Sequence, residues 1–271
     1  MISIGRCIRV DGSTLDSFTG QIAARQVATA GDYQSYVQKV FVHLRYRRVG
    51  RLVIDAIDDG GHFVTIYPHP NMIDAVTNAA EEPVTRRRLP RAQTRRYDPG
   101  RKTCAPPIAG AATTILYPPE GSLKGDSRVG IDPATGALAR PTRSIPAIDP
   151  GNRYFDVDDT LLHELVHALR LVRGLACRRP LADGWVDSEE FIAVMVTNMY
   201  LSEKGKNSAL RGDYGRTFKP LTSPGSFAFD HKEPLTVFCN EMPTLARDLA
   251  AVDCKFNPLR DYIRAFVSVA F

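Results

Sequence analysis

The chain has 271 residues, enough to bury a sizeable core, and its hydrophobic content of 44% and charged content of 24% are ordinary for a globular protein. It has no stretch of 18 or more apolar residues, so we expect no membrane span, and its N-terminus lacks the basic-then-apolar pattern of a signal peptide. The net charge of +5 arises in one place: residues 86–102, the arginine-rich segment, hold eight Arg or Lys and one Asp, a local +7, and the remainder sums to about −2 (5 − 7).

The first third of the chain is predicted to form helices and one strand. Apolar periodicity favours helices over residues 21–28 and 33–48, and a short helix over 51–57. β-Branched and aromatic residues over 62–67 predict a strand, which Pro68 closes.

Residues 71–107 contain the arginine-rich segment, five prolines and few apolar residues. We therefore expect a long basic excursion at the surface, mobile in part. Thr113–Tyr117 has strand character, and residues 118–153, rich in Pro, Gly and Asp, are expected to lack elements of their own.

A well-specified helix is predicted next, with Asp158 as its N-cap and Gly174 as the residue that ends it. Arg170 and Arg173 would favour the dipole of its last turn. Apolar residues recur at the i, i+3, i+4, i+7 spacing of a core-facing stripe, namely Leu162, Leu165, Val166 and Leu169.

This helix contains His163-Glu164-Leu165-Val166-His167, a match to H-E-x-x-H. Residues i and i+4 of a helix lie one above the other, so both imidazoles can reach one metal ion. Glu164 is turned about 100° away and can address a water on that ion instead. Two imidazoles, one further ligand and one open position describe a catalytic zinc site with Glu164 as general base. The alternative is two helix histidines satisfied by local hydrogen bonds.

A second helix, from about Asp187 to Glu203, is apolar all round and is therefore expected to be buried. Gly205 ends it. Residues 206–235 are expected to be loop-rich, and two more helices are predicted over about 243–252 and 259–267.

The third zinc ligand is not fixed by the motif. The longer motif H-E-x-x-H-x-x-G-x-x-H is excluded because residues 170 and 173 are both arginine. Glu189 and Glu190 open the second helix, where a carboxylate could face the first, although an acid there could also complete a capping box with Asp187. Because that helix is apolar all round, periodicity does not choose between the two glutamates. Further alternatives are Asp183, Asp187 and His231.

The cysteines are odd in number, scattered and never spaced as C-x-x-C: Cys7, Cys104, Cys177, Cys239 and Cys254. This pattern predicts neither a disulfide framework nor a thiolate metal site. We expect most of them to be isolated buried thiols of a protein in a reducing interior.

Several of these segments resemble the effector zinc proteases related to NleD, which share their site design with clostridial neurotoxin light chains. The resemblance rests on HELVHALR at 163–170, EFIAV at 190–194 and NMYLSEKG at 198–205. Residues 110–118 are similar to the segment ahead of the motif in that family. The resemblance covers residues 160–215 well and 35–215 loosely, and it does not extend to the arginine-rich segment or to the C-terminal part.

The resemblance implies an α+β, zincin-like metalloprotease fold, with the HExxH helix packed on a small sheet and a mainly helical C-terminal part. Residues 1–271 would form a single catalytic domain with a basic, partly mobile insertion at about 71–107. Glu190 would be the third zinc ligand. Light-chain-type zincins also place an Arg and a Tyr, three residues apart, against the substrate carbonyl, which draws attention to Arg211 and Tyr214. A solvated loop is the alternative there.

The predicted function is that of a zinc metalloendopeptidase, which hydrolyses the peptide bonds of a protein or peptide substrate with a zinc-bound water. Thr113–Tyr117, if it lies along the cleft edge, would hold an extended peptide by strand addition. We expect an effector or toxin made in the bacterial cytoplasm and delivered into another cell by a signal-peptide-independent secretion system. The site residues are the metal ligands His163, His167 and Glu190, the base Glu164, and Arg211 or Tyr214 at the oxyanion.

The arginine-rich segment carries a competing hypothesis. From Arg86 to Lys102 it could solvate a loop, dock an acidic partner or bind nucleic acid, and the protein would then be a basic binding module with a structural or vestigial zinc site. Only Tyr97 is interleaved with the basic residues, so we expect no nucleic acid partner. An intact Glu164 also argues against this alternative, because a structural site has no use for a base.

Overall fold

The computed structural model describes residues 1–13, 29–68, 76–78, 94–117, 130–131, 138–139, 157–181, 185–213 and 220–267. Within them the fold is α+β, as predicted, and no helix there is long and apolar enough to cross a membrane. The helices are α2 (Ala30–Tyr46), α3 (Arg48–Asp58), α4 (Val157–Val172), α5 (Ser188–Glu203), η3 (Asn207–Ala209), α6 (Phe227–Asp230), α7 (Lys232–Glu241), α8 (Pro243–Ala250) and α9 (Pro258–Phe266). The strands are β1 (Ile2–Ser3), β2 (Ile8–Val10), β3 (Val64–Pro68), β4 (Val76–Asn78), β5 (Tyr97–Asp98), β6 (Thr103–Cys104), β7 (Thr113–Tyr117), β8 (Gly130–Ile131) and β9 (Leu138–Ala139).

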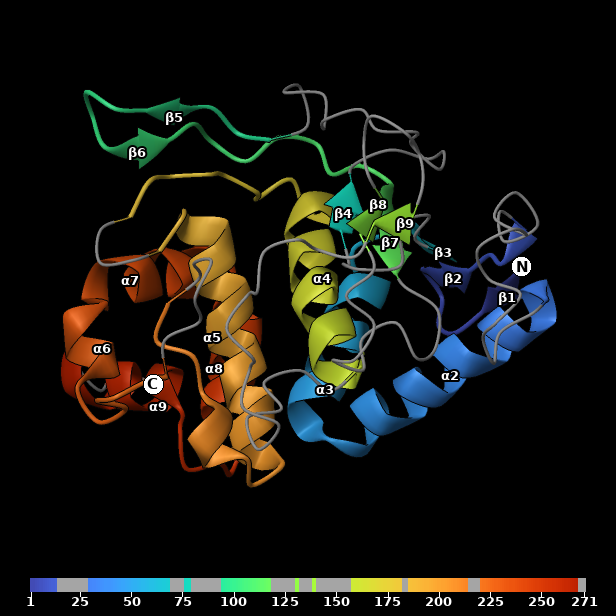
Figure 1. The fold of residues 1–271 in the computed structure, drawn as a ribbon. Helices are drawn as coiled ribbons and strands as arrows, with labels where there is room; N and C mark the ends of the chain where they lie inside the picture. Colours follow the sequence, from blue (N-terminus) through green and yellow to red (C-terminus); the bar gives the residue numbers. More distant parts are fainter. Residues whose placement is uncertain are drawn as a thin grey trace.

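Helix α4 lies at the centre of the molecule, with the main sheet and α2 on one side and α5–α9 on the other (Figure 1). It contacts α2, α3, α5, β4 and β7. One hydrophobic cluster extends from Cys7 to Tyr262 and includes residues of both sides. The helix that carries the HExxH motif is therefore held from several directions.

The main sheet is mixed, with the order β1-β2-β3-β7-β4. β7 forms with the predicted bounds, Thr113–Tyr117, and pairs in parallel with β3 and antiparallel with β4. It is therefore an interior strand, and the hypothesis that it lies along the cleft edge is wrong. Among the described strands, β4 occupies the outer position on this side of the sheet.

Most of the predicted helices are confirmed, with bounds shifted by a few residues: α2, α3, α5, α8 and α9. The expectation of loops over 206–235 is wrong at its end, where α6 and α7 form. α7 includes Pro234 in its first turn, which a helix tolerates because first-turn N–H groups have no partner within it. The helix predicted over 21–28 lies outside the described residues.

The start of α4 differs from the prediction. The helix begins at Val157, so Asp158 lies in its first turn and is not its N-cap. The Asp158 carboxylate accepts hydrogen bonds from the Tyr200 hydroxyl at 2.7 Å and from Lys204 Nζ at 2.8 Å. Lys204 also donates to Asp159 at 3.0 Å. These bonds tie the start of α4 to the end of α5.

The end of α4 contacts the segment that follows the hairpin of β5 and β6. Gly174 ends the helix with a φ of +64°, as predicted, and a Cβ there would lie 1.9 Å from the carbonyl oxygen of Ile108. A disulfide joins Cys104 of β6 to Cys177 of the loop after α4. The prediction that the cysteines form no disulfide is wrong for this pair, because partners 73 residues apart leave no local spacing to recognise. Because two of the five cysteines form this bond, the cysteines no longer support the expectation of a protein in a reducing interior.

Candidate metal centre

Two packed helices present a group of side chains that could hold a metal ion. His163 and His167 come from α4 and Glu190 from the first turn of α5, and one donor atom of each lies within 4.8 Å of the others. Glu190 Oε2 is 3.2 Å from His163 Nε2 and 3.3 Å from His167 Nε2, and the two ring nitrogens are 3.1 Å apart. The i, i+4 spacing of the motif therefore brings both rings to one point, where a carboxylate from another helix meets them.

The three donor atoms fit a tetrahedral ion of the size of zinc. Zinc bonds of about 2.0–2.1 Å at tetrahedral angles separate neighbouring donors by about 3.3 Å. The three observed separations, 3.1, 3.2 and 3.3 Å, are close to that value. The side chains of His167 and Glu190 are 13% and 14% exposed, so the centre is not sealed from solvent.

Burial and mutual contact shift the three pKa values in different directions. Burial lowers the pKa of His163 to about 4, although Glu190 opposes the shift. Burial also acts to lower the pKa of His167, but the hydrogen bond and the charge of Glu190 outweigh it and raise this pKa to about 9. Burial would raise the pKa of Glu190, but the hydrogen bonds to both histidines prevail and lower it. The carboxylate is therefore ionised, as a metal ligand must be.

Glu164 lies beside the donor group but is not one of its members. Its residue is 7% exposed, and its charge, behind the larger effects of burial and Glu190, acts to raise the pKa of His167. The carboxylate is thus within electrostatic reach of the donors while the turn of α4 directs it away from His163. This position suits a base that acts on a water next to the ion.

The two glutamates that open α5 point in different directions. Asp187 caps the helix as predicted, since its Oδ1 accepts hydrogen bonds from the N–H groups of Glu189 at 2.9 Å and Glu190 at 3.1 Å. The Glu190 carboxylate faces the histidines. The Glu189 carboxylate instead accepts from Arg170 Nε at 2.7 Å and from the Cys177 N–H at 2.8 Å. Of the two glutamates between which periodicity could not choose, Glu190 is the one that joins the donor group.

Arg211, expected at the oxyanion, lies close to the donor group. Its residue is 2% exposed, and its positive charge, behind the larger effect of burial, acts to lower the pKa of His163. Asn198 of α5 fixes its backbone, because Nδ2 donates to the Arg211 carbonyl at 2.8 Å and Oδ1 accepts from the Arg211 N–H at 3.0 Å. Sequence reasoning missed Asn198, although an amide inside an apolar helix was a usable signal. Tyr214 lies outside the described residues.

Two of the remaining candidates for the third ligand, His231 and Asp187, are not members of the donor group. His231 lies among aromatic rings, with ring centroids 4.5 Å from Phe227, 5.2 Å from Phe191 and 5.9 Å from Trp185. Asp187 is engaged as a helix cap. Asp183 lies outside the described residues.

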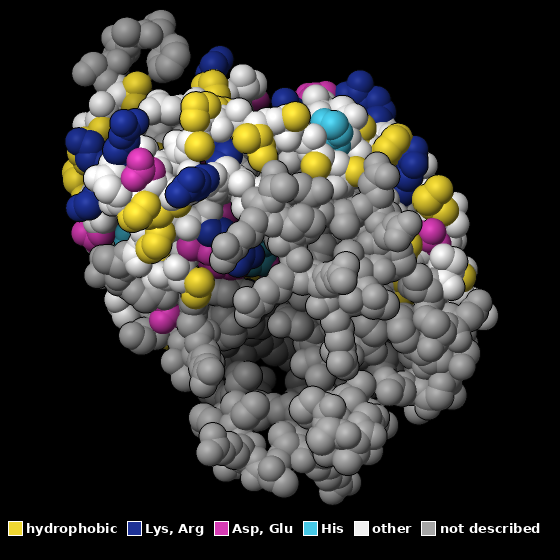
Figure 2. Space-filling view, turned by 90° about the horizontal axis from the view of Figure 1, so that it is seen from above, with side chains coloured by type: hydrophobic (Ala, Val, Ile, Leu, Met, Phe, Trp, Pro, Cys, Tyr) yellow, Lys and Arg dark blue, Asp and Glu magenta, His cyan; other side chains and the backbone are white. Residues whose placement is uncertain are grey.

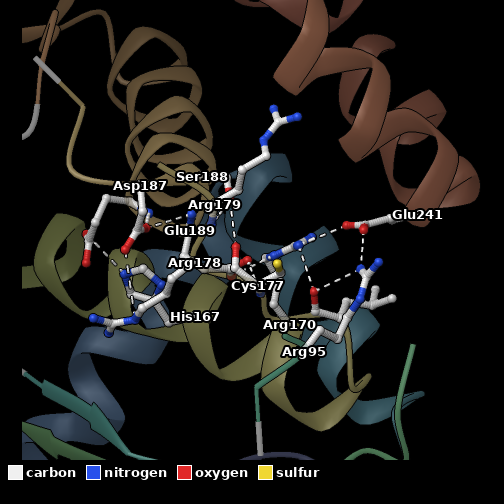
Figure 3. A network of polar contacts seen from close by, with 12 residues as sticks. Arg95, His167, Arg170, Cys177, Arg178, Arg179, Asp187, Ser188, Glu189 and Glu241 are labelled. Atoms are coloured by element: carbon white, nitrogen blue, oxygen red, sulfur yellow. Dashed lines mark hydrogen bonds and ion pairs between the residues drawn. The ribbon is translucent and has the colours of Figure 1, made fainter. Parts of the chain in front are cut away.

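A buried network of alternating charges lies beside the donor group (Figure 3). Arg170 is 1% exposed and donates to Glu189 and, at 2.9 Å, to Glu241 on α7. Glu241 also pairs with Arg95, which the β5–β6 hairpin brings in. Arg95, a cation of the arginine-rich segment, is therefore buried. Arg170, expected only to favour the helix dipole, also forms buried ion pairs with Glu189 and Glu241. Partners this far apart in sequence follow no local pattern.

Three other basic residues of the arginine-rich segment, Arg96, Arg101 and Lys102, are exposed. Figure 2 shows Lys and Arg side chains at the left, the centre and the upper right of the face seen from above. These positions agree with a solvated or docking role.

Comparison with family models, with curated proteins and with solved structures finds no match to the chain.

Proposed function

We propose that the chain is a zincin-like, zinc-dependent endopeptidase that hydrolyses peptide bonds of a protein target. The observation that carries the proposal is the meeting of His163, His167 and Glu190 at one point with Glu164 beside them. Catalytic zinc sites use three protein ligands and keep one position open, whereas structural sites use four. Within the described residues the donor group has three members.

Each residue has a part in the reaction. Zinc, when bound, supplies a Lewis acid that polarises the peptide carbonyl and makes water more acidic. Glu164 takes the proton of the attacking water and can return it to the leaving amine. Arg211 stabilises the negative charge that develops on the carbonyl oxygen.

The sheet offers a place for an extended peptide. Because β7 is interior, a peptide that adds to this side of the sheet pairs with β4. β4 contacts α4, the helix that carries both histidines. We further propose that the enzyme is a delivered effector or toxin, which the resemblance of residues 160–215 to NleD-related proteases supports.

The test compares wild type with Glu164→Gln in the full chain. Because Glu164 acts on water and not on the metal, the variant should keep about one zinc per chain and its fold, while peptide hydrolysis falls by several orders of magnitude. Zinc content, circular dichroism and the appearance of new N-termini in a proteome-derived peptide mixture are the measurements.

His163→Ala is the matched control on the same helix. It should lose most of the zinc as well as the activity. A Glu164→Gln protein that carries full zinc and hydrolyses peptides at the wild-type rate would refute the assigned base. A zinc-free wild type, or a His163→Ala variant with unchanged zinc, would refute the metal centre.

A further inference from the structure

The metal-binding group takes donors from two helices, so something must fix those helices against each other at this level. Glu190 is in the first turn of α5, and a shift of α5 along α4 by a fraction of a helical turn would separate its carboxylate from both histidines. The residues that hold this turn decide whether the three donor atoms stay about 3 Å apart.

We propose that Arg170 and Glu189 are positioning residues of the metal centre, which together hold the α5 carboxylate against the α4 histidines. Arg170 is three residues after His167, and Glu189 precedes Glu190. Their bond, 2.7 Å from Arg170 Nε to Glu189 Oε2, joins the two helices within about one turn of the donors. The inference rests on the proposed function, since it assigns a role at the same metal site.

Both partners of this bond are themselves fixed. The other oxygen of Glu189 accepts the N–H of Cys177 at 2.8 Å, and Ser188 Oγ donates to the Cys177 carbonyl at 2.6 Å. Arg170 Nη2 donates to the Leu175 carbonyl at 3.0 Å and to Glu241 at 2.9 Å. The first turn of α5 is thus attached to the loop that follows α4 by hydrogen bonds to side chain and backbone.

Burial keeps water away from the Arg170–Glu189 ion pair and so preserves its geometry. The side chains of Arg170 and Glu189 are 2% and 5% exposed, so water cannot substitute for either partner. A guanidinium with several fixed acceptors has one orientation, unlike a lysine ammonium. Partners that orient metal ligands from outside the coordination sphere typically change metal affinity by about 10–100-fold when they are removed.

The chain contains a matched control at the far end of the same two helices. Lys204, just after α5, bridges Asp158 and Asp159 at the start of α4 and is also largely buried. Like Arg170, it is a cation that bonds two carboxylates and ties α4 to α5. Lys204→Met and Arg170→Met therefore remove comparable interactions, one about four turns along α5 from Glu190 and one beside it.

The experiment measures zinc affinity by competition with a chelator and the free energy of unfolding of the zinc-free form for wild type, Glu189→Gln, Arg170→Met and Lys204→Met. All three variants should be less stable. Zinc affinity should fall by about 10–100-fold in Glu189→Gln and Arg170→Met and stay within about twofold of wild type in Lys204→Met. The visible absorption of the cobalt-substituted protein, which reports ligand geometry, should change only in the first two.

Glu189→Gln keeps the shape of the side chain, so it decides the question if Arg170→Met does not fold. Wild-type zinc affinity and an unchanged cobalt spectrum in Glu189→Gln overturn the positioning role while leaving the proposed endopeptidase intact. An equal loss of affinity in Lys204→Met also overturns it, because the effect would then be general destabilisation. A wild type that binds no zinc removes both proposals together.

Discussion

At the residue scale, two histidines one helical turn apart respond to pH in opposite ways in the zinc-free protein. The pKa of His167 is raised from 6.5 to about 9, mainly by Glu190 against the effect of burial, so its contribution to stability is complete below pH 6.5 and is lost as the pH rises through about 9. Burial lowers the pKa of His163 from 6.5 to about 4, so protonation favours the unfolded chain and stability falls as the pH drops below 6.5. Stability of the zinc-free form should therefore peak near pH 6.5.

This gives a prediction for unfolding in the presence of a chelator. The free energy of unfolding should fall between pH 6.5 and about 9, by at most about 3 kcal/mol at 1.36 kcal/mol per pKa unit. Urea titrations across this range measure it, and Glu190→Gln, which removes the partner of His167, should flatten the slope. With zinc present the trend should reverse, because protons compete with the metal. A chelated wild type whose stability rises over this range would contradict the prediction.

The identity of the site residues could be predicted more fully than their orientation. His163, Glu164 and His167 follow from a spacing that only a helix makes useful. The choice between Glu189 and Glu190 depends on side-chain direction, which periodicity could not give. Asp158 has the chemistry of an N-cap, but Tyr200 and Lys204, more than 40 residues away in sequence, engage it instead.

At the element scale, the predictions succeeded where the pattern was local. β7 is a short segment rich in β-branched residues that Pro118 follows, α5 has a long apolar run that Gly205 follows, and both formed near the expected bounds. The edge position expected for β7 was wrong because strand order depends on pairing with β3 and β4, which a single strand does not encode. The disulfide and the burial of Arg95 likewise depend on distant partners, Cys177 and Glu241.

The hairpin of β5 and β6 should depend on its disulfide. Closing a loop with a sequence separation of 73 residues restricts the unfolded chain, and the chain-entropy model gives about 4 kcal/mol for a loop of this length. Cys104→Ser should lower the free energy of unfolding by an amount of that order, measured in urea without reductant. Cys239→Ser, at a free and partly buried thiol, is the control and should change little. A reductant should lower wild-type stability and leave that of Cys104→Ser unchanged. Equal stability of the two proteins would show that the bond does not form in solution.

At the scale of the whole molecule, charge variants of the arginine-rich segment test whether its charges take part in recognition of a target. Arg95 is an interior group, so the informative variant replaces Arg86, Arg87, Arg88 and Arg96 with Gln and leaves Arg95 in place. If these charges only solvate a loop, zinc content, short-peptide hydrolysis and cleavage of the intact target should all be unchanged.

If the charges dock an acidic partner, cleavage of the intact target should weaken, most clearly at low salt, while short-peptide hydrolysis stays the same. Duplex DNA serves as the control ligand, and we expect no measurable binding at physiological salt. A tight affinity that falls steeply with salt would instead favour the nucleic-acid alternative. Loss of short-peptide hydrolysis would contradict the separation of roles.

The Cys104–Cys177 bond makes the middle of the chain a covalent ring that includes His163, Glu164 and His167, while Glu190 lies outside it. A single cut of the backbone anywhere between the two cysteines therefore opens the ring without releasing a fragment. A nicked protein should migrate as one species without reductant and as two with it. In a reducing medium the two pieces of a nicked chain would lose their covalent link and would be held together by packing of the shared core alone.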